Sequence, residues 1–152
     1  MINLVLVEPE IPQNTGNIAR SCALSGARLH LVRPLGFSLE EKKLKRAGLD
    51  YWDKLDLVVH DSLELFLEEY GERDIYLITT KAEKTIYEED FSGDVFFLLG
   101  KETAGLPQEL HEAYPDRRLR IPMREGAGLR SLNLSNAAAI VIYEAWRQKD
   151  FA

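Results

Sequence analysis

Short runs of β-branched and aliphatic residues alternate along the chain with longer segments whose apolar positions recur at helical spacing. The apolar runs predict strands at 2–7, 29–33, 57–59, 75–80, 95–99 and 119–121. The helical segments predict helices at 15–25, 39–47, 62–70, 107–113 and 134–148. Such alternation is typical of an α/β fold with a largely parallel sheet, because a crossover between parallel strands is usually a helix.

Three glycines, Gly26, Gly48 and Gly71, follow the first three predicted helices. Glycine is favoured there because the residue after a helix often adopts a left-handed backbone. We therefore expect left-handed C-terminal caps at these positions. The 152 residues contain no repeat, linker or low-complexity stretch, so a single domain over 1–152 is expected.

The predicted helix 134–148 is apolar on more than one face. From Ala137 to Trp146 its apolar residues are too many to lie on one side of a helix. Some surface beyond the sheet must cover them. A second copy of the chain is the economical cover, so we predict a homodimer that packs through Ala137 to Trp146. A helix sandwiched within one chain is the alternative.

Composition restricts the function further. A formal net charge of -6 argues against a protein that coats nucleic acid nonspecifically, since such affinity comes from Lys and Arg neutralising phosphates. RNA binding would depend on local basic residues, and the candidates are Arg20, Lys43, Arg46, Arg124 and Arg130; the alternative for each patch is an ordinary solvated surface.

One cysteine and three scattered histidines give neither a disulfide nor the ligand spacing of a metal site. No apolar stretch approaches the length that crosses a membrane. The N-terminal run lacks the basic flank and cleavage site of a signal peptide and indicates a strand instead. We expect a cytoplasmic protein without a metal.

Neither a G-x-G-x-x-G turn nor a P-loop is present, so any cofactor site must be built differently. The first candidate segment is the proline-stiffened loop that begins at Glu8 and enters a helix. Asn14, Asn17 and Arg20 recur there at every third residue and fall near one stripe of that helix. Helix N-terminal amides and an arginine can clamp a phosphate or a ribose. An asparagine cap with a surface arginine is the structural alternative.

Two later segments also follow predicted strands, where α/β proteins place their sites. In the first, the strand 95–99 stops at Gly100 and turns through Glu102 and Gly105, and glycine lets backbone approach a flat ligand closely. The second runs from the strand 119–121 to the last helix. Its polar residues exceed what one helix cap needs, which suggests a ligand; they are Ser131, Asn133, Ser135 and Asn136.

Taken together, these segments resemble the SPOUT RNA methyltransferases, and within them the small tRNA (cytidine/uridine) 2′-O-methyltransferases of the TrmL/YibK type. The resemblance covers nearly the whole chain, through residues 8–20, 46–51, 79–81, 100–107, 121–123, 131–136 and 143–147. It implies a C-terminal deep trefoil knot, an exception to the usual unknotted topology. It also implies S-adenosylmethionine bound by Ile78, Leu99, Gly100, Gly105, Ile121, Met123, Ser131 and Leu132.

The resemblance further implies methyl transfer to the ribose 2′-hydroxyl of the wobble nucleotide in a tRNA anticodon stem-loop, with leucine tRNAs as candidates. In the family dimer, the arginine equivalent to Arg20 lies near the methyl donor of the other subunit. Arg20 and Asn14 are therefore the catalytic candidates. A guanidinium keeps its proton far above neutral pH, so we assign Arg20 to orienting the ribose or phosphate and stabilising charge, with Asn14 assisting and the proton acceptor open.

Two other functions stay open at this point. A noncatalytic RNA-binding or assembly factor could keep the same scaffold, although the presence of Asn14, Arg20, Glu102 and Ser131 speaks against it. An α/β enzyme acting on a small nucleotide would also be compatible with the acidic composition.

Overall fold

The sheet is parallel throughout. The computed structural model describes residues 1–39, 52–126, 128–129 and 131–152. Within these, the strands are β1 (Ile2–Val7), β2 (Arg28–Val32), β3 (Leu57–His60), β4 (Ile75–Ile78), β5 (Val95–Leu99) and β6 (Arg118–Leu119). They form a six-stranded sheet in the order β3-β2-β1-β5-β4-β6, and each pair of neighbours is parallel. The predicted α/β fold with a largely parallel sheet is confirmed.

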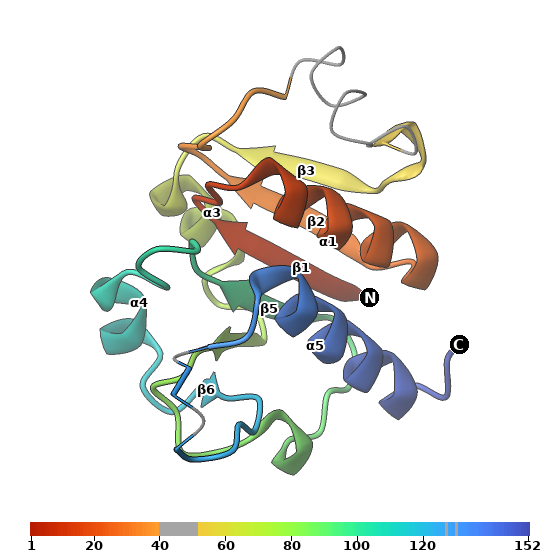
Figure 1. The fold of residues 1–152 in the computed structure, drawn as a ribbon. Coiled ribbons are helices and arrows are strands. Elements are labelled where there is room, and N and C mark those ends of the chain that lie inside the picture. Colours follow the sequence, from red (N-terminus) through yellow and green to blue (C-terminus); the bar gives the residue numbers. More distant parts are fainter. Residues whose placement is uncertain (40–51, 127, 130) are drawn as a thin grey trace.

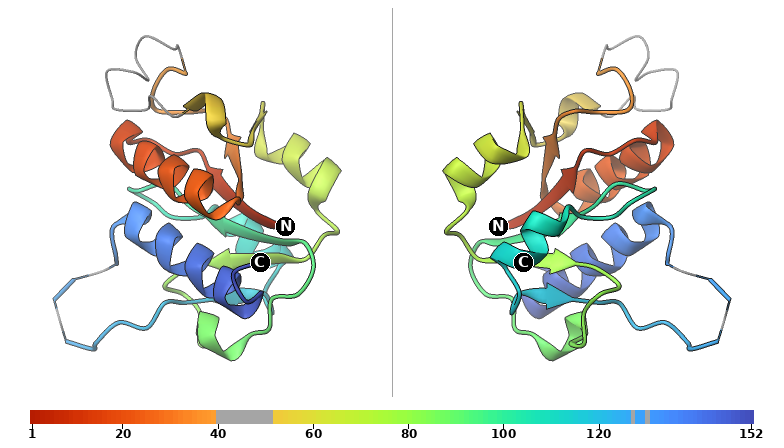
Figure 2. Two further views of the ribbon diagram at one scale, coloured as in Figure 1. Left: turned by 90° about the vertical axis from the view of Figure 1, so that its right-hand side faces the viewer. Right: turned by 90° about the vertical axis from the view of Figure 1, so that its left-hand side faces the viewer.

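Helices cover both faces of the sheet (Figure 1). They are α1 (Pro12–Ser25), α3 (Leu63–Tyr70), α4 (Gln108–Ala113) and α5 (Leu134–Gln148), with short 3-10 helices η1 (Trp52–Lys54) and η2 (Ile86–Glu88). The helices α1 and α5 lie side by side on one face, and α3 and α4 lie on the other (Figures 1 and 2). The chain therefore has three layers.

The central strand β1 explains the two cores. Its side chains are all buried, as expected for a parallel strand covered on both faces. Leu4 and Leu6 pack into the core beneath α1 and α5, whereas Val5 and Val7 pack beneath α3 and α4. The alternating side chains of this one strand thus contribute to two hydrophobic cores, one on each face of the sheet.

Two of the three glycine caps can be assessed. Gly26 has φ 78° and the predicted left-handed conformation. The prediction for Gly71 is wrong, since its φ of -59° is right-handed. Close packing accounts for that glycine, because an added Cβ would lie 2.4 Å from the carbonyl oxygen of Leu67. Gly48 and residues 40–47 of the predicted second helix lie outside the described residues.

The last helix matches its predicted bounds and is only partly covered. Ala138, Val141, Ile142 and Ala145 are buried against the sheet and α1. Tyr143 is 43% exposed, and its ring packs against Trp146. Apolar surface therefore stays on the outer side of α5. No helix in the described part of the chain is long and apolar enough to cross a membrane.

Candidate functional site

A pocket of about 520 Å³ lies at the carboxyl ends of β4 and β5. This volume is typical of a small-molecule site, for which roughly 300–1,000 Å³ is usual. Its walls come from the segments after three strands and from the start of α1. All eight residues predicted to hold a cofactor line it, namely Ile78, Leu99, Gly100, Gly105, Ile121, Met123, Ser131 and Leu132. Asn14 lines it as well.

The loop from Gly100 to Gly105, which we call the cofactor loop, is a tight turn. The amide of Gly105 donates to the carbonyl oxygen of Lys101 at 2.9 Å. A Cβ at Gly100 would lie 2.0 Å from the carbonyl carbon of Gly105, and Gly105 has φ 70°. Glycine is required at the first position by space and is favoured at the second by conformation. The backbone is thereby brought to the surface of the pocket.

The carboxylate of Glu102 ties the cofactor loop to the start of α1. Its Oε1 accepts from the amide of Glu10 at 2.9 Å, and its Oε2 accepts from the amide of Ile11 at 2.9 Å. The same Oε2 accepts from Asn14 Nδ2 at 3.2 Å. The side chain of the N-cap residue Ile11 makes no cap hydrogen bond, and Glu102 instead satisfies the amide of that residue, which is one of the amides at the start of α1 without a partner inside the helix.

Glu10 makes the reverse connection. Its Oε1 accepts from the amide of Thr103 at 3.1 Å and from the Thr103 hydroxyl at 2.7 Å. These bonds, led by the one from the hydroxyl, lower the pKa of Glu10. Sequence reasoning missed Glu10 and Thr103, since nothing in the local pattern around either residue points to a contact across more than 90 positions.

Asn133 joins the start of α5 to the same network. Its Oδ1 caps the helix by accepting from the Ser135 amide at 2.8 Å, and its Nδ2 donates to Asn14 Oδ1 at 3.2 Å. The surplus of polar residues predicted here divides in two. Ser131 and Asn133 line the pocket, whereas Ser135 and Asn136 receive the cap and do not line it.

Another buried polar group in the wall is His111 of α4, which sequence reasoning also missed. It is 6% exposed, and its Nδ1 has no hydrogen-bond partner among the described residues. Burial, and then the charges of Lys81 and Arg118, lower its pKa. A buried imidazole therefore lies in a wall that also includes Thr79, Thr80 and Lys81.

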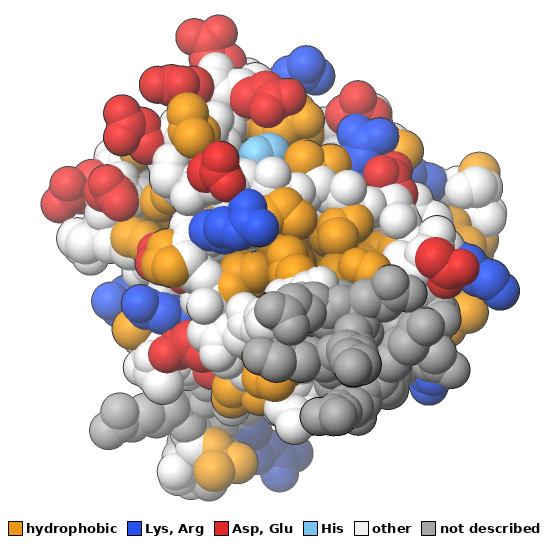
Figure 3. Space-filling model, turned by 90° about the horizontal axis from the view of Figure 1, so that it is seen from above, with side chains coloured by type: hydrophobic (Ala, Val, Ile, Leu, Met, Phe, Trp, Pro, Cys, Tyr) orange, Lys and Arg blue, Asp and Glu red, His pale blue; other side chains and the backbone are white. Residues whose placement is uncertain are grey.

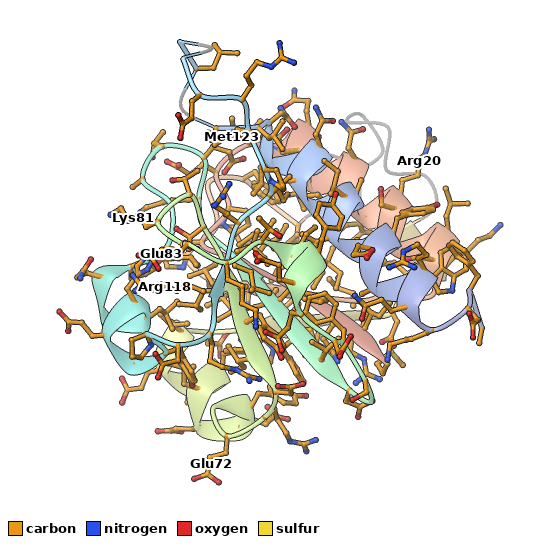
Figure 4. The ribbon with its side chains drawn as sticks, turned by 90° about the horizontal axis from the view of Figure 1, so that it is seen from below. Arg20, Glu72, Lys81, Glu83, Arg118 and Met123 are labelled. Atoms are coloured by element: carbon orange, nitrogen blue, oxygen red, sulfur yellow. The ribbon has the colours of Figure 1, made fainter. Side chains whose placement is uncertain are left out.

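The basic residues predicted to bind RNA do not line the pocket where the structure describes them. Arg20 is exposed on α1 and is not among the residues that line the pocket. Figure 4 shows it on the far side of the helix pair from Lys81 and Arg118. Arg124 is exposed next to the pocket residue Met123. Lys43, Arg46 and Arg130 lie outside the described residues.

The described residues show neither a basic surface patch in the view of Figure 3 nor a cluster of metal ligands. The face seen in Figure 3 carries Asp and Glu side chains with Lys and Arg between them, and its described residues form no continuous basic patch. No group of three or more His, Cys, Asp or Glu that could hold a metal is found in the described ranges. Cys22 is fully buried, and burial raises its pKa to about 12.

Known proteins resemble the chain in sequence. The pattern of the SpoU rRNA Methylase family matches residues 1–143. A curated relative from Methylovorus glucosotrophus (strain SIP3-4), named tRNA (cytidine(34)-2'-O)-methyltransferase, is 50% identical. The match covers 100% of this chain and 98% of that relative.

Solved structures agree with the sequence match. One, described as giving structural insights into the 2-OH methylation of C/U34 on tRNA, has a TM-score of 0.89 at 45% identity and covers 100% of this chain and 98% of its own. The SpoU methyltransferase AviRb from Streptomyces viridochromogenes, solved with the cofactor AdoMet, has a TM-score of 0.83 at 26% identity. That match covers 97% of this chain and 57% of AviRb. In sequence and in fold, the chain belongs to the SpoU rRNA methylase family.

Proposed function

We propose that this chain is an enzyme that transfers a methyl group from S-adenosylmethionine to the ribose 2′-hydroxyl of cytidine or uridine at position 34 of tRNA. The observation that carries the proposal is the pocket at the strand ends, which gathers the eight expected cofactor residues and Asn14 in a member of this family. The names of relatives with about half of their residues in common supply the substrate class. Leucine tRNAs are the first candidates.

The pocket fits S-adenosylmethionine by its chemistry. Ile78, Leu99 and Ile121 offer apolar walls for an adenine, and the glycines of the cofactor loop let backbone amides and carbonyls reach its polar edge. The Nδ1 of His111, which has no partner within the described ranges, marks a further polar position in the wall. When bound, the cofactor supplies an electrophilic methyl group on a sulfonium.

Arg20 orients the ribose or a neighbouring phosphate and stabilises developing negative charge, and Asn14 assists. A planar guanidinium forks onto phosphate oxygens and keeps its proton, so it suits this role better than that of a base. Arg20→Lys preserves the charge and loses the fork. We expect single-turnover methylation to slow in this variant, and an unchanged rate would refute the orientation role.

A homodimer through α5 brings Arg20 of one copy to the pocket of the other. Two observations support it: Arg20 lies outside the pocket of its own chain, and the outer side of α5 keeps Tyr143 and part of Trp146 accessible. Basic side chains of two acidic chains would then meet at one RNA-binding surface. The expected contributors are Arg20, Lys43, Arg46, Arg124 and Arg130.

Mixed dimers test that arrangement. At a cofactor concentration near the wild-type Kd, Arg20→Ala and Gly100→Ala are each expected to keep little activity alone, and refolding them together should restore about a quarter of the wild-type activity, because half of the dimers then hold one complete site. Sedimentation of the wild type as a monomer at micromolar concentration, or mixing without recovery, would contradict the dimer.

The proposal also includes a single domain over 1–152 with a trefoil knot at its C-terminal end. The segment after β6 runs beside the loop after β4, where the Arg120 amide donates to the Lys84 carbonyl oxygen and the Ile86 amide donates to the Arg120 carbonyl oxygen, before α5 returns to the centre of the sheet (Figure 2). Stretching the unfolded chain in optical tweezers should give a contour shorter than 152 residues allow. A full-length contour would argue against the knot. A cytoplasmic location also stays a prediction.

One experiment decides between this function and its alternatives. Calorimetry with S-adenosylmethionine is followed by mass spectrometry of nucleosides from tRNA incubated with the enzyme and cofactor. We expect saturable binding and a 2′-O-methylated nucleoside at position 34. Binding without that product would favour a noncatalytic RNA-binding factor, and absence of cofactor binding would favour an enzyme of small nucleotides.

A further inference from the structure

The cofactor loop and the start of α1 hold each other through two carboxylates that point in opposite directions. Glu102 accepts from the amides of Glu10 and Ile11, and Glu10 accepts from the amide and hydroxyl of Thr103. Each carboxylate thus binds the segment that carries the other. The two segments are more than 90 residues apart in sequence, so this contact exists only in the folded chain.

The contact also meets an electrostatic need of α1. This 14-residue helix has no side-chain cap of its own, since its N-cap residue is Ile11. Unpaired amides and the positive end of the helix dipole favour a negative group at this position. Glu102 provides it from the cofactor loop, and loss of its charge would loosen both segments at once.

Asn14 is fixed as a consequence. A carboxylate only accepts hydrogen bonds, so Asn14 must direct its Nδ2 toward Glu102 and its Oδ1 toward Asn133 Nδ2. Asn133 in turn caps α5 with its own Oδ1. A single orientation of the Asn14 amide therefore satisfies the cofactor loop, α1 and α5 together.

Both oxygens of Glu102 are engaged by N–H groups of the protein. This leaves the carboxylate poorly placed to take a proton from a substrate hydroxyl. Arg20 lies on α1, six residues beyond Asn14, so a displaced helix start would move this residue as well as Asn14. Glu102 can therefore influence the reaction through the positions of Asn14 and Arg20.

We propose that Glu102 and Glu10 are positioning residues that form a reciprocal clamp, which holds Asn14 and the start of α1 in register with the cofactor loop. The inference rests on the proposed methyl transfer and names the contact that aligns the cofactor loop with the helix start that carries Asn14. The clamp acts through Asn14 and the backbone, and neither carboxylate takes part in the chemical step.

Glu102→Gln tests the clamp with little change of shape. The new amide nitrogen faces N–H groups and cannot accept from them. With cofactor and tRNA saturating, we expect single-turnover methylation to fall about ten-fold or more, as for a small misalignment of reacting groups, while its pH dependence keeps its shape. Glu10→Ala is expected to give a smaller loss in the same direction. Glu109→Gln, an exposed acid on α4, is the matched control.

A double variant separates positioning from independent effects. If Glu102 acts through Asn14, then Glu102→Gln combined with Asn14→Ala should be no slower than the slower single variant. Multiplied losses would overturn the clamp. A wild-type rate in Glu102→Gln would overturn it too, and loss of a pH-dependent limb would make Glu102 a base instead.

Hydrogen exchange gives a readout that does not depend on activity. The amides of Glu10 and Ile11 should exchange faster in Glu102→Gln, and the amide of Thr103 should exchange faster in Glu10→Ala, with unchanged exchange in the buried strands as the sign of an intact fold. Unchanged exchange at all three amides would contradict the clamp. Absence of tRNA methylation by the wild type, with these exchange effects present, would instead refute the proposed function alone.

Discussion

Two hydrogen-bonded chains of polar side chains, which we call the open chain and the sealed chain, have different roles. The open chain lies at the carboxyl ends of the strands and the starts of α1 and α5, where Glu102, Asn14 and Asn133 connect three distant segments and border the pocket. Beneath α3, a second chain crosses three adjacent strands in the interior. Its members are Asn3, His30 and His60, which are at most 6% exposed. The first chain opens onto a ligand space and the second is sealed.

The sealed chain has a fixed hydrogen-bond direction. Asn3 Nδ2 donates to the carbonyl oxygen of Val95, so its Oδ1 must accept from His30 Nε2 at 2.9 Å. His30 Nδ1 is then the acceptor for His60 Nε2, also at 2.9 Å. The rings of Phe66, Tyr70 and Phe96 enclose the pair. We conclude that the second chain serves stability, whereas the first serves alignment at a site.

Removal of His30 should produce the largest effect and confine it to stability. His30→Ala leaves Asn3 Oδ1 and His60 Nε2 without partners and opens a cavity, which we expect to cost about 2–4 kcal/mol of unfolding free energy. Urea denaturation measures this change. Cofactor affinity, measured by calorimetry on the folded protein, should stay within about two-fold; a larger loss would erase the contrast between the two chains.

Acid should weaken the sealed chain by a comparable amount. Burial, then the charges of His60 and Arg28, lower the pKa of His30 to about 3, against some opposition from Asp56; burial also lowers the pKa of His60, and Glu69 opposes that shift. Because the unfolded chain binds protons first, stability is full above pH 6.5 and falls as the pH drops toward 3. For His30 alone we expect about 3 kcal/mol between pH 7 and pH 4.

Denaturant titrations across this range check the sign and the residue. His30→Ala should show a shallower dependence on pH than the wild type. Equal slopes in the two proteins would mean that other groups account for the acid sensitivity.

A methyl group added in the cofactor loop, beside the open chain, should lower cofactor affinity more than it lowers the stability of the fold. In Gly100→Ala the added Cβ meets the backbone of Gly105 and forces the cofactor loop to move. Overpacking of this size costs about 1–3 kcal/mol, and we expect most of it as a loss of roughly 10- to 100-fold in cofactor affinity by calorimetry. Affinity unchanged within error would show that the loop does not shape the site.

The smallest expected effect lies at the cap of α3, which covers the sealed chain. The Ser62 hydroxyl accepts from the Leu65 amide at 3.1 Å, and Ser62→Ala should cost about 1 kcal/mol. Thermal unfolding measures it. Methylation at a temperature where both proteins are folded should not change, and a slower reaction would place α3 in the catalytic path.

The sequence predicted much of the scaffold because local patterns determine it. The bounds of β1, β5 and α5 are the predicted ones, since each is a largely apolar segment with clear ends. β4 ends at Ile78, two residues before its predicted end, where the Lys81 amide turns back to the Thr79 hydroxyl. The eight pocket residues came from the family resemblance, with local support only at the glycines and Ser131.

The contacts that organise the site could not be predicted from local patterns. The bonds of Glu10 with Thr103, and of Asn14 with Asn133, depend on which strand ends the topology brings together. The place of His111 in the pocket wall could not be predicted either, because a lone histidine in a short amphipathic helix usually has only a packing role. For the same reason the pairing of His30 with His60 needed the register of β2 and β3.

The position of β1 in the sheet has a consequence for synthesis of the chain. β1 lies between β2 and β5, and β5 is made only after four other strands have left the ribosome or entered its tunnel. Until then, one edge of a largely apolar strand has no partner, and such edges pair with other chains. The nascent protein is thus most exposed to aggregation when its N-terminal half is complete and its cofactor loop does not yet exist.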